Sequence, residues 1–134
     1  ERAGGRLAGL QWQGRIIRSN DLLPSDVVHY LRHVVARQEW PRGTSLQEYI
    51  DDLRAVILDP GSGIFVNMYG GVFQQLGFVG PSRKQGPGGA PWTIVEYRAG
   101  FGHWVTGYQS TWSKLVQNPQ RSALQWLKKP SGLP

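Results

Sequence analysis

The feature that most constrains the fold is a helix with both ends marked, followed at once by a change of hydrophobic period. Residues 45–48 read Ser-Leu-Gln-Glu, the pattern of an N-terminal capping box. Apolar residues then recur at helical spacing as far as Ile57, and Asp-Pro-Gly at residues 59–61 ends the helix. After Gly63 strand-forming residues take over. This order predicts helices that precede a sheet.

An earlier helix is expected from Ser25, a good N-cap residue that follows Pro24. Its apolar residues repeat at helical spacing and are Val27, Val28, Leu31, Val34 and Val35. The stripe leaves His29 and His33 on the other side, where we expect a solvated face. Their i, i+4 spacing would suit one metal ion or one phosphate. A zinc-protease helix would have Glu after His29, however, and this chain has Tyr30.

Four strands are expected after these helices. Segments 64–69 and 72–79 flank a Gly-Gly turn, and segments 92–98 and 103–108 flank a turn at residues 99–102. A basic Gly/Pro-rich loop, taken to be flexible, spans residues 80–91, and residues 113–129 are weakly helical with a break at Pro119. The predicted fold class is α+β, with N-terminal helices packed on a curved antiparallel β-sheet.

Charge points to an anionic partner. Fifteen Lys and Arg against nine Asp and Glu give a formal charge of +6, and only four of the cations are Lys. The planar guanidinium group of Arg matches phosphate geometry, so the balance favours nucleic acid or an anionic surface. A basic domain with no role in nucleic-acid binding would show the same composition.

Several kinds of site are excluded by the residue types present. The chain has no Cys, which excludes disulfide frameworks, zinc ribbons, iron–sulfur sites and thiol nucleophiles. No apolar run approaches the roughly 20 residues of a membrane span, and no signal peptide is evident. The chain opens without an initiator Met, so we expect a processed product or a segment of a larger protein.

The hairpin of residues 92–111 carries the side chains best suited to chemistry. If residues 100 and 101 form its tip, Arg98 lies opposite His103 and Glu96 lies opposite residue 105. Glu96, Arg98 and His103 would then share one face, and Thr106 and Tyr108 would lie on the other. A slip of one residue in the register would break up this group.

These residue types can cleave RNA without a metal or another cofactor. Glu96 or His103 could take the 2′-hydroxyl proton, Arg98 could stabilise the charge on phosphorus, and His103 could protonate the leaving oxygen. Three hydroxyl residues could position phosphate oxygens, namely Thr106, Tyr108 and Thr111. Arg83 and Lys84 in the basic loop could bind substrate, as a mobile flap. The competing interpretation is that Glu96 and Arg98 form an ordinary ion pair of a half-exposed strand.

Three segments together carry a family resemblance. Residues 46–60 begin Leu-Gln-Glu-Tyr-Ile and end Val-Ile-Leu-Asp-Pro, and the late strands read Trp-Thr-Ile-Val-Glu-Tyr (92–97) and His-Trp-Val-Thr-Gly-Tyr (103–108). Over residues 22–112 this pattern resembles the barnase/EndoU/colicin/RelE-like ribonucleases. That superfamily includes C-terminal toxin domains of contact-dependent inhibition and other polymorphic toxin proteins. The strand motif of the superfamily matches this chain at Thr106 and Tyr108, and the resemblance implies that these residues lie near the catalytic centre. Several members also use a Lys in the sheet, which this hairpin lacks.

The resemblance implies a single catalytic domain over residues 21–134, with residues 1–20 as a linker or short strand. It implies a monomeric, metal-independent endoribonuclease without a cofactor that cuts RNA, above all tRNA, and leaves a cyclic phosphate. The enzyme would be secreted or delivered from the producing bacterium, act in the target-cell cytoplasm and be neutralised by a cognate acidic immunity protein. The alternative is a non-catalytic basic module that binds nucleic acid or an acidic partner protein. ADP-ribosyl transfer ranks below both, because Glu96 and Arg98 stand in no ribosyltransferase spacing.

Overall fold

The fold consists of a five-stranded sheet with helices on both sides. The computed structural model describes residues 11–12, 15–16, 25–70, 73–98, 106–118 and 121–131. Its elements, in chain order, are β1 (Gln11–Trp12), β2 (Arg15–Ile16), α2 (Ser25–Tyr30), the π-helical turn η1 (Leu31–Ala36), α3 (Leu46–Leu58), β3 (Gly63–Tyr69), β4 (Phe73–Pro81), β5 (Trp92–Arg98), β6 (Thr106–Ser110), α4 (Trp112–Gln117) and β7 (Arg121–Lys128).

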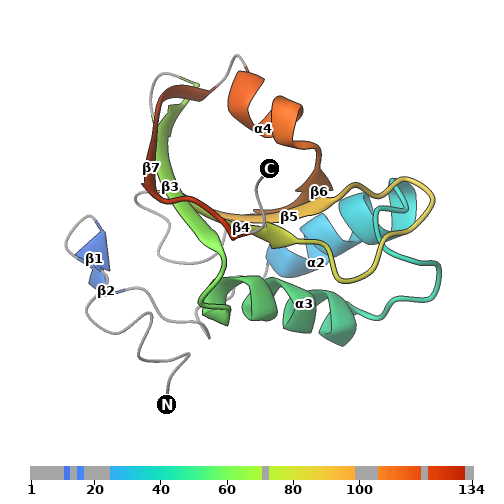
Figure 1. Ribbon diagram of the computed structural model, residues 1–134. Coiled ribbons are helices and arrows are strands. Elements are labelled where there is room, and N and C mark those ends of the chain that lie inside the picture. Colours follow the sequence, from blue (N-terminus) through green and yellow to red (C-terminus); the bar gives the residue numbers. More distant parts are fainter. Residues whose placement is uncertain are drawn as a thin grey trace.

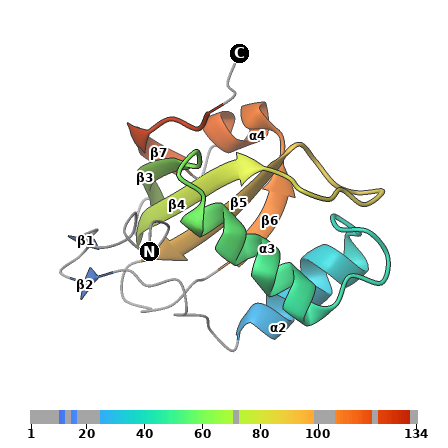
Figure 2. The same cartoon turned by 60° about the horizontal axis from the view of Figure 1, so that its bottom comes forward.

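The sheet is antiparallel throughout and has the strand order β6-β5-β4-β3-β7, while β1 and β2 form a separate pair. It curves strongly, with α4 on its concave side and α2 and α3 on the opposite side (Figure 1). Figure 2 shows α3 lying across the strands and α2 beside it. The predicted α+β class, with N-terminal helices on a curved antiparallel sheet, is confirmed. No helix in the described part of the chain has both the length and the apolar character that a membrane crossing needs.

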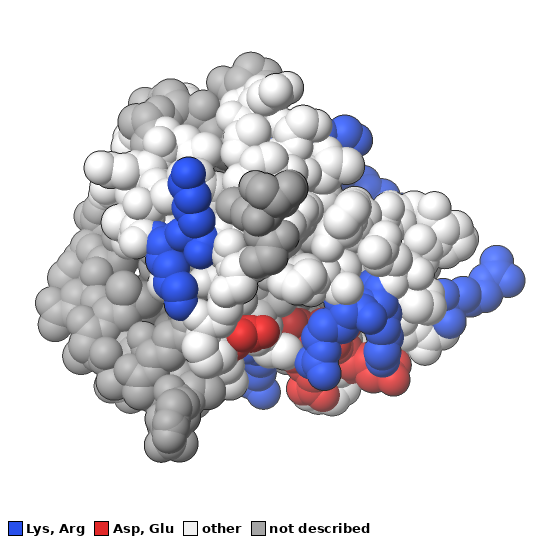
Figure 3. Space-filling model, viewed as in Figure 1, with Lys and Arg blue, Asp and Glu red and all other residues white. Residues whose placement is uncertain are grey.

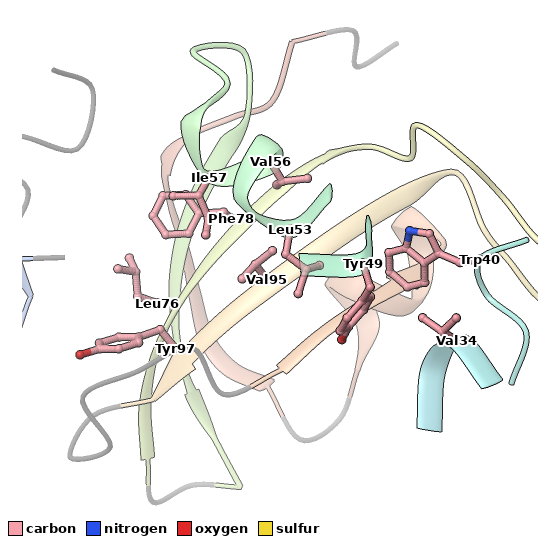
Figure 4. Packing of buried hydrophobic residues seen from close by; sticks show 10 residues of the cluster. All are labelled: Val34, Trp40, Tyr49, Leu53, Val56, Ile57, Leu76, Phe78, Val95 and Tyr97. Carbon is pink, nitrogen blue, oxygen red and sulfur yellow. The ribbon is translucent and has the colours of Figure 1, made fainter. Parts of the chain in front are cut away.

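Helix α3 forms as its sequence predicts. The Ser45 hydroxyl accepts from the Glu48 backbone N–H at 3.1 Å, and the Ser45 N–H donates to the Glu48 carboxylate at 2.8 Å. Four residues of its apolar stripe are buried, namely Tyr49, Leu53, Val56 and Ile57. They pack on side chains of β4 and β5, and Trp40 meets the Tyr49 ring edge-on with the ring centres 5.0 Å apart (Figure 4). This cluster anchors the helices to the sheet.

A second apolar cluster fills the concave side. Its buried members are Phe65, Val79, Ile94 and Leu115, and three half-buried Trp side chains pack against them. Trp112 of α4 stacks on Trp126 of β7 with ring centres 5.2 Å apart and planes 12° apart. The short helix α4 is therefore held between the two edges of the curved sheet.

The C-terminal segment differs from the prediction. Residues 121–128 were expected to be helical, but they form the edge strand β7, antiparallel to β3. Leu124 and Trp126 contact the concave cluster, whereas Gln125 and Leu127 between and after them are exposed. This alternation has the period of a strand, and tertiary packing outweighs the helical propensity of the segment.

The first helix also presents a different face from the one predicted. Val27, Val28, Leu31 and Val35 are 47 to 53% exposed, whereas His33 is 5% exposed. The expectation of a solvated histidine face was therefore wrong for His33. Part of the reason is the π-helical turn from Leu31 to Ala36, whose wider turn shifts the phase of the side chains.

The β5–β6 register is one residue away from the predicted one. Glu96 pairs with Thr106 instead of Val105, and Ile94 pairs with Tyr108. Because a one-residue slip moves a whole strand to the other face, Thr106 and Tyr108 lie on the face of Glu96 and not opposite it. His103, which the predicted register set beside Arg98, lies outside the described residues.

The capping box predicts an acid-sensitive contribution to stability. The hydrogen bond from the Ser45 N–H holds the pKa of the Glu48 carboxyl below its ordinary value. A lowered folded-state pKa adds stability above the unfolded-state pKa, and this stability is lost as pH falls through the folded-state pKa. In urea titrations from about pH 6 to about pH 2, Glu48→Gln should lose less stability on acidification than the wild type. Asp51→Asn, a charge-matched change on the same helix, should keep the wild-type loss; equal losses in Glu48→Gln and wild type would contradict the assignment.

Candidate active site at the edge strand

The edge strand β6 brings two hydroxyl side chains beside a buried carboxylate. Thr106 and Tyr108 alternate with Gly107, so both lie on one face of the sheet together with Glu96 of β5. The Tyr108 hydroxyl donates to the Glu96 carboxylate at 3.1 Å, and Glu96 is only 2% exposed. A buried carboxylate is stable only where it has hydrogen-bond donors, so this pair fixes the Tyr108 ring.

Two imidazoles from the first helix complete this group. The ring nitrogen Nδ1 of His29 lies 3.2 Å from the Thr106 hydroxyl. The His33 ring lies between its neighbours, with its centre 6.0 Å from that of His29 and 5.8 Å from that of Tyr108. The two rings of the helix and the Tyr108 ring of the edge strand therefore form one stack of three. The only signal in the sequence was the i, i+4 spacing of the two histidines, from which a solvated face was predicted.

Glu39 holds His33 in place. One carboxylate oxygen of Glu39 lies 2.8 Å from His33 Nδ1, and the other accepts from the Gln109 backbone N–H at 2.7 Å. Because a carboxylate oxygen accepts here, Nδ1 of His33 donates and Nε2 is left for another partner. The chain reaches this geometry through Gln38, whose φ of 54° reverses the backbone after the π-helical turn. Glu39 was not among the residues predicted from the sequence.

Gly107 lets α3 approach the edge strand closely. The Tyr49 hydroxyl donates to the Gly107 carbonyl at 2.6 Å. A Cβ at Gly107 would lie 2.4 Å from a methyl carbon of Leu53, which is buried. The glycine between Thr106 and Tyr108 thus sets the distance between the edge strand and the main core.

The basic loop between β4 and β5 is tied to the same region at several points. The backbone N–H groups of Gly86 and Gly88 donate to the carbonyls of Glu39 and Gln38, each at 2.9 Å. The Gln109 side chain accepts from the Ala90 N–H at 2.9 Å and donates to the Lys84 carbonyl at 2.7 Å. These bonds make the loop a fixed wall of the site instead of the mobile flap considered from the sequence.

The other predicted site residues lie in different surroundings. Arg83 is 62% exposed in its side chain and lies 3.9 Å from Asp52 of α3. Lys84 is exposed and contributes its carbonyl to the bond with Gln109. Thr111 caps α4 by accepting from the Lys114 N–H at 3.2 Å. Arg98 ends β5 opposite Gln75 in β4; its side chain, like His103, lies outside the described part.

A cleft opens beside Tyr108 and Glu39. Its volume is about 710 Å³, and its lining includes Arg37, Thr111 and Lys114. Among the acidic residues whose exposure is described, the exposed and half-exposed ones lie on and just after α3 and are Glu48, Asp51, Asp52 and Asp59; red atoms gather in that region in Figure 3. The cleft carries none of these four acids. Among the described residues, no three His, Asp or Glu side chains are grouped so that they could hold a metal ion.

In comparisons with known proteins, no family model, no curated protein and no solved structure matches the chain.

The glycine contacts give a stability test of the loop wall. A Cβ at Gly86 would lie 2.1 Å from the Trp40 carbonyl oxygen, which is backbone and cannot move freely. Gly86→Ala should therefore lower the free energy of unfolding by about 1–3 kcal/mol, measured by urea denaturation. Gln85→Ala changes the exposed neighbour and should stay within about 0.5 kcal/mol of wild type. Equal midpoints for both variants would show that the loop is not packed in this way.

Proposed function

We propose that this chain is a metal-independent endoribonuclease that cleaves RNA by attack of a 2′-hydroxyl and leaves a 2′,3′-cyclic phosphate. The observation that carries the proposal is the meeting of two imidazoles, His29 and His33, with the hydroxyl residues Thr106 and Tyr108 at the sheet edge. This reaction needs a base, an acid and donors for a phosphate oxygen, and these side chains supply each of them. Arg37 and Lys114 in the adjoining cleft supply positive charge.

The geometry supports distinct roles for the two imidazoles. His33 is oriented by Glu39, as a general base is oriented by a carboxylate, so it takes the 2′-hydroxyl proton. His29 is half-buried and reaches Thr106, so it is accessible to protonate the leaving 5′-oxygen. The Thr106 hydroxyl donates to a non-bridging phosphate oxygen when substrate displaces its contact with His29. Tyr108 positions His33 through ring stacking.

The biological setting proposed with this activity rests on the family resemblance. The substrate is tRNA, the domain is a toxin delivered into the cytoplasm of a target bacterium, and an acidic immunity protein neutralises it. The net charge of +6 suits both the RNA and the acidic partner. A small acidic protein encoded next to this chain that blocks cleavage would support the setting; a neighbour that does not bind would count against it.

The direct experiment is incubation of the purified protein with total tRNA in EDTA. Cleavage with a 2′,3′-cyclic phosphate at the new end is the expected result. Intact RNA at micromolar protein would overturn the proposal. If RNA is bound without a product, with an affinity that falls steeply with salt, the non-catalytic basic module is the correct description.

Single substitutions test the assignment of the residues. His29→Ala should lower kcat/KM by about 100- to 10,000-fold, the usual contribution of general acid–base catalysis. Leu31→Ala, at an exposed position of the same helix, should match wild type. Circular dichroism must show that both variants remain folded.

Two further variants test the residues assigned from the sequence. Arg98→Ala and His103→Ala should also abolish cleavage if the hairpin carries the chemistry. If these two stay active while His29→Ala is inactive, the site belongs to the helix and the edge strand alone. If Arg98→Ala and His103→Ala are inactive while His29→Ala stays active, the hairpin carries the chemistry.

The variant Glu39→Gln tests whether Glu39 orients His33 for catalysis or only stabilises the fold. The substitution keeps the shape of the side chain but replaces the carboxylate oxygen that accepts from His33 or from the Gln109 N–H by an amide NH₂. We expect kcat to fall by at least about 100-fold with little change in KM, because the base is misoriented and substrate binding is intact. The bell-shaped dependence of kcat/KM on pH should lose its base-controlled limb. A variant that is merely less stable, with wild-type kcat and pH profile at low temperature, would contradict this role.

A further inference from the structure

The cleft beside Tyr108 is enclosed by four different parts of the chain. Arg37 directly follows the π-helical turn, Gly88 to Ala90 belong to the tied loop, Tyr108 to Ser110 belong to the edge strand, and Ser113 to Leu115 belong to α4. Its volume of about 710 Å³ lies in the range of ligand-binding sites.

Two cations reach this cleft from separate elements. Arg37 and Lys114 are both exposed and both line it. The one acid in the lining, Glu39, is buried and has both oxygens engaged by His33 and Gln109. Its charge is therefore committed to the protein, and the accessible charge in the cleft is positive. A phosphate group is the ligand that a Lys and an Arg in one cleft fit best.

Neutral polar groups surround the cations. Hydroxyl and amide side chains of Thr111, Ser113 and Gln117 line the same space. Such groups donate and accept hydrogen bonds and suit the sugar and base of a nucleotide as well as its phosphate. Thr111 caps α4, and Ser113 and Gln117 belong to it, so this helix fixes all three relative to Lys114.

The cleft adjoins the proposed catalytic group through two shared residues. Tyr108 and Glu39 line it, and the same two residues contact His33 by ring stacking and by hydrogen bond. A strand whose phosphate is cleaved at the imidazoles would therefore continue directly into the cleft. Successive phosphates of a single strand lie within the reach of such neighbouring sites.

We propose that this cleft is a binding subsite for the nucleotide next to the cleaved bond of single-stranded RNA, with the phosphate of that nucleotide between Arg37 and Lys114. The identity of the strand rests on the proposed function; the binding does not require cleavage. Thr111, expected from the sequence to position phosphate oxygens, then belongs to this subsite and not to the catalytic group.

The test measures binding of a non-cleavable 2′-O-methyl RNA oligonucleotide at several salt concentrations. Arg37→Ala and Lys114→Ala should each weaken binding by about tenfold at low salt. Each should reduce the slope of log affinity against log salt by about 0.7, the loss of one phosphate contact to a single strand. Lys129→Ala removes the same charge from an exposed position beyond β7, the opposite edge of the sheet, and should match wild type.

A kinetic arm distinguishes the subsite from the catalytic group. On a longer oligonucleotide, the loss of kcat/KM in Arg37→Ala and Lys114→Ala should exceed the loss on a dinucleoside monophosphate by about tenfold, because the short substrate has no second phosphate. Equal losses on both substrates would place the cations at the cleaved phosphate and overturn the subsite. Equal binding by all three variants would also overturn it, even if cleavage is observed. If wild type binds as expected but cuts nothing, the proposed function fails and the subsite remains.

Discussion

The hydrogen bonds of the Glu39 carboxylate hold the site together. One oxygen engages His33 of the helix, the other engages the backbone of the edge strand at Gln109, and the Glu39 carbonyl accepts from Gly86 of the loop. Three segments far apart in the sequence thus meet at one residue. Burying a carboxylate has a large desolvation cost that only complete hydrogen bonding offsets. A chain that needed only a stable core would use apolar residues there, so the polar contacts favour a functional reason for the arrangement.

Local signals predicted much of the fold. The capping box at Ser45 and the strand patterns on either side of Gly70 act over a few residues, and α3, β3, β4 and β5 form where these signals place them. Strand β7 escaped prediction because its alternation is short and only packing against the concave cluster reveals it. The π-helical turn escaped because wider helical turns leave no distinct hydrophobic period.

The site was harder to predict because its contacts are distant in sequence. His29 meets Thr106 across 77 positions, and nothing local marks that pair. Glu96, Thr106 and Tyr108 were all singled out, yet on opposite faces, because the hairpin register depends on a turn that the sequence does not define. Glu96, Thr106 and Tyr108 were therefore visible in the sequence, whereas their arrangement, and the part of Glu39, required the tertiary structure.

The tied loop has a consequence for how a ligand would enter. Its backbone bonds to Gln38 and Glu39, and the Gln109 clamp, exist before any ligand arrives. Binding of a ligand in the cleft beside this loop would therefore cost little conformational entropy, since the loop does not have to become ordered around the ligand. Encounter would be governed by diffusion and by long-range attraction between opposite charges, and departure would need no opening step. A cleft of this kind is suited to rapid exchange of ligands, with discrimination left to its rigid shape.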